Sequence, residues 1–192
     1  YTGMIQYPTV VLGESDIQLA KDKAAELVEF FRPRIIKNQK SGSHIQDVEQ
    51  RLKRLERDQL TGQLAQLGGT IYLTGSDNMY RIQRWNCMRT PERGDGGYDI
   101  LGLTLDFKGS RLRPNWNPTQ YLLPIRQNER KEGWTYGLVV VNFTKGEAHC
   151  HIMGWVSDSE LEGKYQKDGQ FAGAYTVPNN ELHPFPNMRW EL

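Results

Sequence analysis

The sequence has few cysteines, no long apolar segment and none of the common nucleotide-binding or hydrolase motifs. Two cysteines in 192 residues, Cys87 and Cys150, are too few for a disulfide scaffold and suit a reducing compartment. No apolar run reaches the roughly 20 residues of a membrane span, and the first residues lack the pattern of a signal peptide. The sequence also lacks a Walker-type phosphate loop and a G-x-S-x-G nucleophile elbow. We therefore expect a cytoplasmic protein without a membrane partner.

The composition is that of one ordinary globular domain. The 192 residues are 38% hydrophobic and 24% charged, proportions typical of a folded protein. A chain of this length can bury a substantial core. We expect a single domain over residues 1–192, with an N-terminal helical and linker extension over 1–45, a core over 46–162 and a C-terminal wrapping tail over 163–192.

The net charge of +1 hides an uneven distribution of charge along the chain. Residues 30–46, 81–93 and 108–113 are strongly basic, and the stretch from Ser157 onward has a net negative charge. A polyanion could contact a basic face assembled from the three basic stretches. Scattered, solvated charges explain the same distribution, so charge alone does not indicate a partner.

Apolar residues at helical spacing predict two long helices in the first third of the chain. The first begins at Ser15, a favourable N-cap, and we expect Pro33 to end it. The second is predicted over residues 45–68, where the pair Gly68-Gly69 is expected to act as the C-cap. The segment between the two helices is predicted to be a loop.

From Thr70 onward the pattern is that of β-strands. Segments rich in β-branched and aromatic residues alternate with turn residues, and they predict strands over residues 70–75, 79–88, 98–111, 119–125, 136–143 and 148–157. The run Leu138 to Val141 is apolar on both faces, as expected for a central strand that is covered on both sides. A short helix is predicted after Ser157. Helices followed by a mixed sheet indicate the α/β class, close to α+β.

The sequence RGDGGYDILGLTLDFKGSR, residues 93–111, concentrates the groups most able to do chemistry. Asp99 begins an apolar run, and Asp106 and Lys108 stand at its end. Gly102 can bend the chain between them into a hairpin or a kinked strand. Because strand side chains alternate, Asp106 and Lys108 are expected on the same face, roughly 7 Å apart along the backbone. The motif therefore predicts that two carboxylates and an ammonium group converge.

This combination of groups suits metal-assisted hydrolysis of a phosphodiester. Mg²⁺ prefers carboxylate oxygens, so Asp99 and Asp106 could hold it together with a backbone carbonyl and a substrate phosphate, and Mn²⁺ is expected to substitute. Lys108 could orient or deprotonate the attacking water, or stabilise developing negative charge. Each half of the motif also has a simpler explanation, because Asp-Gly pairs form ordinary turns and Asp-x-Lys on a strand is commonly a surface salt bridge.

The stretch GDGGYDI…LDFKGS resembles the signature of the PD-(D/E)XK nuclease superfamily, which has the restriction-endonuclease-like fold. Its Gly-Asp-Gly-Gly-x-Asp-Ile form is similar to that of Mrr-type restriction nucleases and related phage and prokaryotic enzymes. The resemblance covers roughly residues 48–162 and implies a DNA nuclease with a mixed central β-sheet flanked by helices. It implies that Asp99 and Asp106 are magnesium ligands and that Lys108 assists the water.

Two positions depart from the pattern of that superfamily. Members often carry a glutamate on a preceding helix, frequently after a glycine, whereas this chain has Gln63 after Gly62. A neutral amide can bond a metal-bound water or offer its carbonyl, but it adds no charge; Glu56 is an alternative donor nearly two turns upstream. Tyr98 replaces the proline of the family name. The resemblance thus implies Gln63 at the active site, and the missing charge also allows a second function: a catalytically weakened protein of this fold that binds nucleic acid or serves as an assembly subunit.

Basic and aromatic side chains near the motif are candidates for binding DNA. The candidates are Arg111, Arg113, Trp116, Arg93, Lys37 and Lys40. Trp116 lies beside two of these arginines and could stack on a base, although most tryptophans are core or interface anchors. A homodimer would suit a symmetric duplex, but no residue of the sequence indicates one.

Two histidines, His149 and His151, fall on one face of a predicted strand, with Cys150 on the other. A zinc site would need two more convergent ligands, and neither Cys87 nor His44 has motif spacing. We therefore interpret both histidines as ordinary strand residues.

Overall fold

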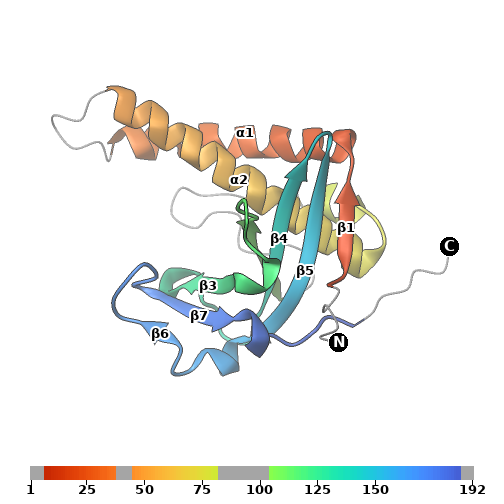
Figure 1. Ribbon diagram of the computed structural model, residues 1–192. Helices are drawn as coiled ribbons and strands as arrows, with labels where there is room; N and C mark the ends of the chain where they lie inside the picture. The colour runs from red at the N-terminus through yellow and green to blue at the C-terminus, as the bar shows by residue number, and fades with distance from the viewer. Residues whose placement is uncertain (1–6, 38–44, 82–103, 187–192) are drawn as a thin grey trace.

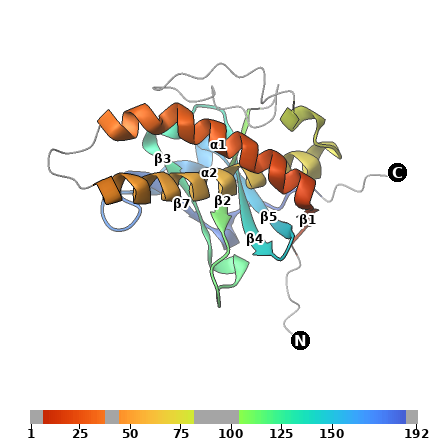
Figure 2. The same cartoon turned by 90° about the horizontal axis from the view of Figure 1, so that it is seen from above.

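The structure of the protein is a computed structural model that describes residues 7–37, 45–81 and 104–186. Within these residues two long helices and two β-sheets form three layers (Figure 1). Helices α1 (Glu14–Lys37) and α2 (Ile45–Thr74) form the first layer, and seen from above they lie over the strands (Figure 2). The chain is a mixed α/β protein, as predicted. Neither described helix combines the length and the apolarity that crossing a membrane requires.

The middle layer is a four-stranded mixed sheet with the strand order β1-β5-β4-β2. Its strands are β1 (Thr9–Leu12), β2 (Leu105–Arg111), β4 (Thr135–Thr144) and β5 (Glu147–Ser157). β5 pairs antiparallel with both β1 and β4, whereas β2 pairs parallel with β4. Strands β4 and β5 confirm the prediction for this part of the chain, while β1 was not predicted.

The third layer is a small antiparallel sheet with the order β3-β7-β6. Its strands are β3 (Leu122–Arg126), β6 (Tyr165–Gln166) and β7 (Ala174–Pro178). The described residues also include four short 3₁₀ helices, three between strands and the last after β7: η1 (Pro118–Gln120), η2 (Gln127–Glu129), η3 (Asp158–Leu161) and η4 (Asn179–Glu181). The region expected to form a wrapping tail therefore contributes two of the three strands of this layer.

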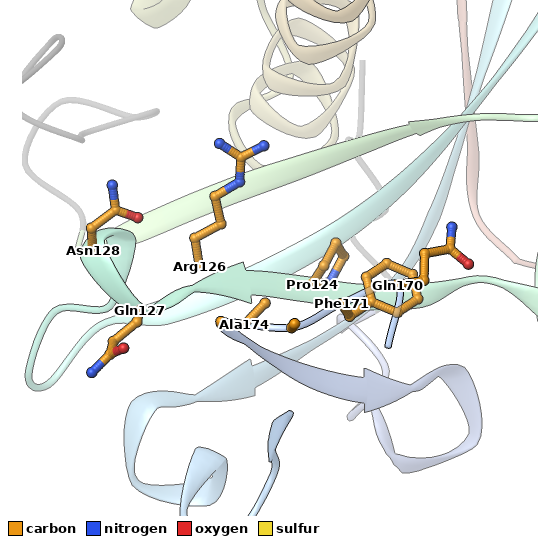
Figure 3. Close-up of a pocket in the computed structure, with 9 residues that line it drawn as sticks. Pro124, Arg126, Gln127, Asn128, Gln170, Phe171 and Ala174 are labelled. Carbon is orange, nitrogen blue, oxygen red and sulfur yellow. The ribbon is translucent and has the colours of Figure 1, made fainter. Parts of the chain in front are cut away.

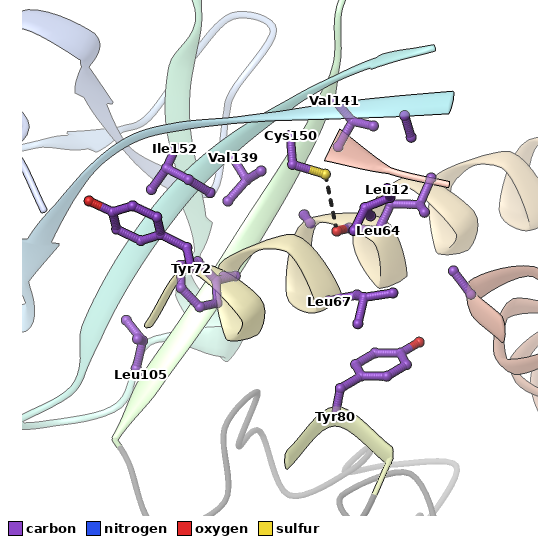
Figure 4. Packing of buried hydrophobic residues seen from close by; sticks show 14 residues of the cluster. Leu12, Leu64, Leu67, Tyr72, Tyr80, Leu105, Val139, Val141, Cys150 and Ile152 are labelled. Atoms are coloured by element: carbon purple, nitrogen blue, oxygen red, sulfur yellow. Dashed lines mark hydrogen bonds between the residues drawn. The ribbon is translucent and has the colours of Figure 1, made fainter. Parts of the chain in front are cut away.

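The four-stranded sheet separates two hydrophobic cores. The core on the helix side includes Leu64, Leu105, Phe107, Val139, Val141 and Cys150 (Figure 4). The core between the two sheets includes Leu123, Ile125, Tyr136, Leu138, Val140 and Val177. β4 contributes to both cores because its alternate side chains point to opposite faces. This confirms the prediction of a central strand covered on both sides.

Helix α2 approaches the sheet closely at two consecutive glycines. A Cβ atom at Gly68 would lie 2.7 Å from the Cβ of Cys150, and one at Gly69 would lie 2.5 Å from the ring of Phe107. The thiol of Cys150 donates a hydrogen bond to the carbonyl oxygen of Leu64 at 3.4 Å across the same contact (Figure 4). The glycines therefore make room for the sheet.

The prediction that Gly68 and Gly69 end the second helix is wrong. α2 continues through the segment predicted as a strand at 70–75 and ends at Thr74, followed by Gly75 with a φ of 77°. The amide of Gly75 donates to the carbonyl oxygen of Ile71 at 2.8 Å, which makes it the actual C-terminal glycine. The β-branched residues fit into the helix because the hydroxyls of Thr70 and Thr74 each donate to the carbonyl four residues earlier.

Two further local predictions are corrected by the structure. Pro33 lies inside α1, which continues to Lys37, because a proline removes one backbone hydrogen bond but keeps a helical φ. Residues 79–81, the described start of the strand predicted over 79–88, are helical, since an aromatic and apolar pattern does not separate a short helix from a strand. The short helix predicted after Ser157 is present as the 3₁₀ helix η3.

Candidate active site

Strand β2 places Asp106 and Lys108 on the face of the sheet that points away from α2. Phe107 lies between them in the chain and packs against α2 at Gly69. Because side chains alternate along a strand, its two neighbours point toward the second sheet. The ammonium Nζ of Lys108 lies 3.0 Å from the carboxylate Oδ2 of Asp106, and both side chains are mostly buried. The structure therefore brings these two predicted site residues into direct contact.

A second carboxylate, Glu129, contacts the same lysine. Lys108 donates a hydrogen bond to the Oε2 atom of Glu129 at 2.8 Å. Glu129 ends the 3₁₀ helix η2, which follows β3, so the second sheet supplies this partner. Sequence reasoning missed Glu129, because it is 21 residues from Lys108 and no spacing rule relates the two positions.

The two carboxylates keep Lys108 protonated. Burial by itself lowers the pKa of Lys108, but the negative charges of Asp106 and Glu129 outweigh it and raise the pKa above the ordinary value of a lysine. At neutral pH the side chain is therefore a cation and a hydrogen-bond donor. In this arrangement it can stabilise an anion, but it has no free lone pair with which to accept a proton.

The predicted metal ligands are only partly within the described residues. Asp106 and Glu129 supply carboxylate oxygens, the donor type that Mg²⁺ prefers, on both sides of Lys108. Asp99 lies outside the described residues, as does Gly102. Among residues 7–37, 45–81 and 104–186, no group of three or more His, Cys, Asp or Glu side chains could hold a metal ion. The carboxylate of Asp106 is a suitable magnesium ligand, and the predicted site needs Asp99 as its second carboxylate.

Gln63 lies in the buried part of α2 and forms a hydrogen bond with Tyr80. Its Oε1 atom accepts a hydrogen bond from the hydroxyl of Tyr80 at 2.9 Å. Tyr80 is fully buried on the helix side of the sheet, whereas Asp106 and Lys108 face the second sheet. Within the described residues neither Asp106 nor Lys108 is a hydrogen-bond partner of Gln63. Its predicted place at the active site stays a prediction.

A basic groove of about 470 Å³ begins where β2 ends. Its lining includes Arg57, Ser110, Arg111 and Arg113, and Asp58 is its one acidic residue among those described. The structure thus gathers two of the predicted DNA-binding residues, Arg111 and Arg113, in one groove.

The other predicted DNA-binding residues lie at different distances from this groove. Trp116 is adjacent, because the guanidinium carbon of Arg113 lies 5.0 Å from the centre of its ring. Lys37 is the last residue of α1 and does not line the groove. Lys40 and Arg93 lie outside the described residues.

A second cavity, of about 780 Å³, flanks the turn that carries Glu129. Its walls include Pro124, Arg126 and Asn128 from β3 and η2, and Phe171 from the loop before β7 (Figure 3). Amide side chains, among them Gln127 and Gln170, supply much of its polar lining. No residue of this cavity was singled out from the sequence, because neutral amides in loops carry no recognisable spacing.

Neither family models, nor curated proteins, nor solved structures gave a match to this chain. The geometry around β2 is therefore the basis for any assignment of function.

The pair of histidines on β5 shows ordinary strand contacts. His149 lies 3.0 Å from the carboxylate of Glu147, and His151 shares a 3.0 Å hydrogen bond with the hydroxyl of Thr9 on β1. Cys150 is buried on the opposite face, where burial raises the pKa of its thiol to about 12. The thiol is thus protonated at neutral pH, and a protonated thiol is a poor metal ligand and nucleophile.

Proposed function

We propose that the protein is a metal-dependent deoxyribonuclease of the PD-(D/E)XK type that hydrolyses phosphodiester bonds within DNA. The observation that carries the proposal is the contact of Asp106 with Lys108 on one face of β2, at 3.0 Å and mostly buried. An isolated surface salt bridge would need neither the burial nor the second carboxylate at Glu129. The order of α2, the D-x-K strand β2 and the long apolar strand β4 also supports a restriction-endonuclease-like core.

In this proposal each charged side chain has a separate task. Asp99 and Asp106 would hold Mg²⁺, or Mn²⁺ in its place, and the bound ion would supply Lewis-acid chemistry for phosphodiester hydrolysis. Lys108 remains a cation and stabilises the negative charge that develops on the phosphate oxygens during attack. Glu129 orients the ammonium group, and Arg111 and Arg113 bind phosphates on the neighbouring part of the DNA backbone.

A second candidate is a protein of the same fold with weakened catalysis that binds nucleic acid. The observation that favours it is the hydrogen bond from the hydroxyl of Tyr80 to Gln63, because this bond occupies the amide oxygen that could otherwise bind a metal ion or its water. This candidate predicts DNA binding without magnesium-dependent cleavage. A gel assay of the wild-type protein on plasmid, linear and single-stranded DNA, with and without Mg²⁺ or Mn²⁺, separates the two candidates.

Substitution of Asp106 and Lys108 should separate metal binding from cleavage. Asp106→Ala removes a ligand, so both calorimetric Mn²⁺ binding and cleavage should collapse. Lys108→Ala keeps the carboxylates and removes a charge that repels the cation. It should therefore bind Mn²⁺ at least as well as the wild type, while cleavage falls by about 10²-fold or more, the usual scale for a group that stabilises transition-state charge.

Lys167→Ala and Asp168→Ala are matched controls, because they remove the same charges from an exposed turn of the second sheet. Both should bind Mn²⁺ and cleave DNA as the wild type does. Thermal unfolding of all four variants checks that they are folded. A Lys108→Ala protein that cleaves DNA at the wild-type rate would remove the lysine from the mechanism, and a wild-type protein that binds no Mn²⁺ would refute the metal site.

A further inference from the structure

The loop that follows β2 holds a tryptophan at the surface. Trp116 is 43% exposed, whereas Trp134 is 8% exposed. The loop is nevertheless well anchored: the amide of Trp116 donates to the carbonyl oxygen of Arg113 at 3.1 Å, and Asn117 accepts a hydrogen bond from the amide of Thr119 at 3.0 Å. The indole is thus held in place without being buried.

Tyr121 fixes both the backbone and the ring in this loop. Its hydroxyl donates to the carbonyl oxygen of Arg111 at 2.9 Å and accepts from the amide of Arg113 at 2.7 Å. Its ring meets the indole of Trp116 at an interplanar angle of 61°, with 5.4 Å between the ring centres. An aromatic ring that is fixed in advance loses little conformational entropy when it stacks on a ligand.

The positive charge around Trp116 is not neutralised by the described part of the protein. Within residues 7–37, 45–81 and 104–186, neither Arg111 nor Arg113 forms an ion pair with an acidic side chain. Their guanidinium groups lie over aromatic rings instead, Arg113 over Trp116 at 5.0 Å and Arg111 over Phe143 at 4.3 Å. Arg113 therefore remains able to bind an anion beside the exposed ring, and Arg111 can bind one elsewhere in the groove.

The groove begins directly after the proposed catalytic lysine in the chain. Gly109 and Ser110 line the groove and directly follow Lys108 on β2. Ser110 shares a face of the strand with Lys108, about 7 Å farther along the backbone. Lys108 itself does not line the groove, so β2 relates the two sites through its backbone alone.

We infer that this groove binds single-stranded DNA, with one unpaired base stacked on the indole of Trp116. Inside a duplex both faces of each base are covered by its neighbours, so away from duplex ends an indole can stack only on a base that has left the duplex. The inference rests on the proposed nuclease function and names its substrate class: single strands or unpaired overhangs. The two features that carry it are the fixed, exposed ring and the arginines of the adjoining groove, of which Arg113 lies directly over the ring.

Fluorescence anisotropy in EDTA tests this inference without any requirement for cleavage. The probes are a fluorescein-labelled oligothymidylate and a labelled hairpin duplex of the same length, whose two strands are joined by a polyethylene glycol linker that contains no bases. Trp116→Leu keeps an apolar contact with Tyr121 but cannot stack on a base, whereas Trp116→Phe keeps an aromatic face. Tyr165→Ala is the control, because Tyr165 is another exposed aromatic residue that meets a second tyrosine, Tyr175, edge-on.

The wild type should bind the oligothymidylate more tightly than the hairpin. Trp116→Leu should weaken oligothymidylate binding by about 5- to 100-fold, the range for loss of one base–aromatic stack, and should leave hairpin binding within about twofold. Trp116→Phe should recover most of the loss, and Tyr165→Ala should match the wild type. Arg113→Ala should weaken both complexes and reduce their salt dependence, as expected for a phosphate contact.

Equal loss on both DNA forms, or no loss in Trp116→Leu, would overturn the inference. These outcomes differ from a failure of the proposed nuclease function. A wild type that cleaves DNA while Trp116→Leu binds single strands normally would refute the stacking site alone. A wild type that cleaves nothing, but whose single-strand binding depends on Trp116, would refute the nuclease and leave the stacking site in place.

Discussion

Lys108 is the residue at which burial and charge compete most directly. Burial favours its neutral form, and the adjacent carboxylates of Asp106 and Glu129 favour the cation by a larger amount. Its two carboxylate partners hold the ammonium group in one orientation. It can therefore stabilise a developing charge without the reorganisation that water would need.

Glu160 is a second residue whose surroundings shift its titration. It accepts hydrogen bonds from the hydroxyl and the amide of Ser157, at 2.7 and 2.9 Å, and its other oxygen lies 2.5 Å from His183. The hydrogen bonds from Ser157 and His183 lower the pKa of Glu160 to about 2. A carboxyl group with a lowered pKa stabilises the fold above its unfolded pKa of about 4.3, and that stability is lost as the pH falls toward 2.

Glu160→Gln should therefore destabilise the protein in a pH-dependent manner. At pH 7 urea denaturation should show a loss of at most about 1 kcal/mol, because the pair with His183 is partly exposed. The difference from the wild type should shrink as the pH is lowered from about 4 toward 2, where the wild-type carboxylate is also protonated. Glu162→Gln, in an exposed position nearby, is the control. A loss of stability that is the same at every pH would contradict the ionic role of Glu160.

At the scale of single elements, the glycines of α2 have different structural roles at different positions. Gly68 and Gly69 allow the helix to approach β5 and β2, while a Cβ atom at Gly62 would meet no atom within 4 Å. Gly75 ends the helix. The same residue type therefore permits packing at two positions, terminates the helix at another and leaves space at a fourth.

The same alanine substitution should consequently have opposite effects at two positions of α2. Gly62→Ala should stabilise the protein by about 0.5–1 kcal/mol, because alanine loses less backbone entropy in a helix. Gly69→Ala should destabilise it by about 1–3 kcal/mol, because the new methyl group would overlap the ring of Phe107. Urea denaturation of the two variants measures both effects. Equal and small effects would mean that the sheet can move away from the helix at little cost.

How far the sequence predicts these elements depends on whether the signal is local. The apolar run of β4 and the alternation of β5 identify both strands to within one residue at each end. The end of α2 was misplaced, because a glycine pair that makes room for Phe107 looks the same in sequence as a C-cap. The four residues of β1 (Thr9–Leu12) are too few to show a periodic pattern.

The same distinction between local sequence patterns and long-range packing applies to the candidate site. The contact between Asp106 and Lys108 follows from the two-residue period of a strand, so the sequence could predict it. The contact of Lys108 with Glu129, and the bond from Tyr80 to Gln63, depend on how distant segments pack. The sequence does identify Arg111 and Arg113 as candidates, but only the fold places them in one groove.

At the scale of the whole molecule, the two sheets are joined by an ion pair as well as by their shared core. Arg130, in the turn between β3 and β4, donates to the carboxylate of Asp158 at 2.5 Å. Its guanidinium carbon also lies 4.8 Å from the ring centre of Tyr175 on β7. Asp158 is buried and begins η3, so one arginine contacts the ends of both sheets.

Asp158→Ala should weaken the junction of the two sheets. It would leave Arg130 without its carboxylate partner in a partly buried position, which should cost about 2 kcal/mol in the free energy of unfolding. Glu29→Ala is the matched control, because it breaks an exposed carboxylate–arginine pair with Arg32 and should cost far less. Chemical denaturation of both variants measures the contrast. Equal costs would indicate that the Arg130 pair contributes no more than a surface pair.

The parallel pairing of β2 with β4 has a consequence for the order of folding. β4 and β5 are separated by two residues, Lys145 and Gly146, so this hairpin can close within microseconds. β2 can pair with β4 only after the intervening chain has looped out through β3, and that longer loop must be closed at an entropic cost. We therefore expect a newly made chain to form its central hairpin early and to dock the strand that carries Asp106 and Lys108 late. The buried centre of the sheet would then form before the residues of the candidate site are brought together.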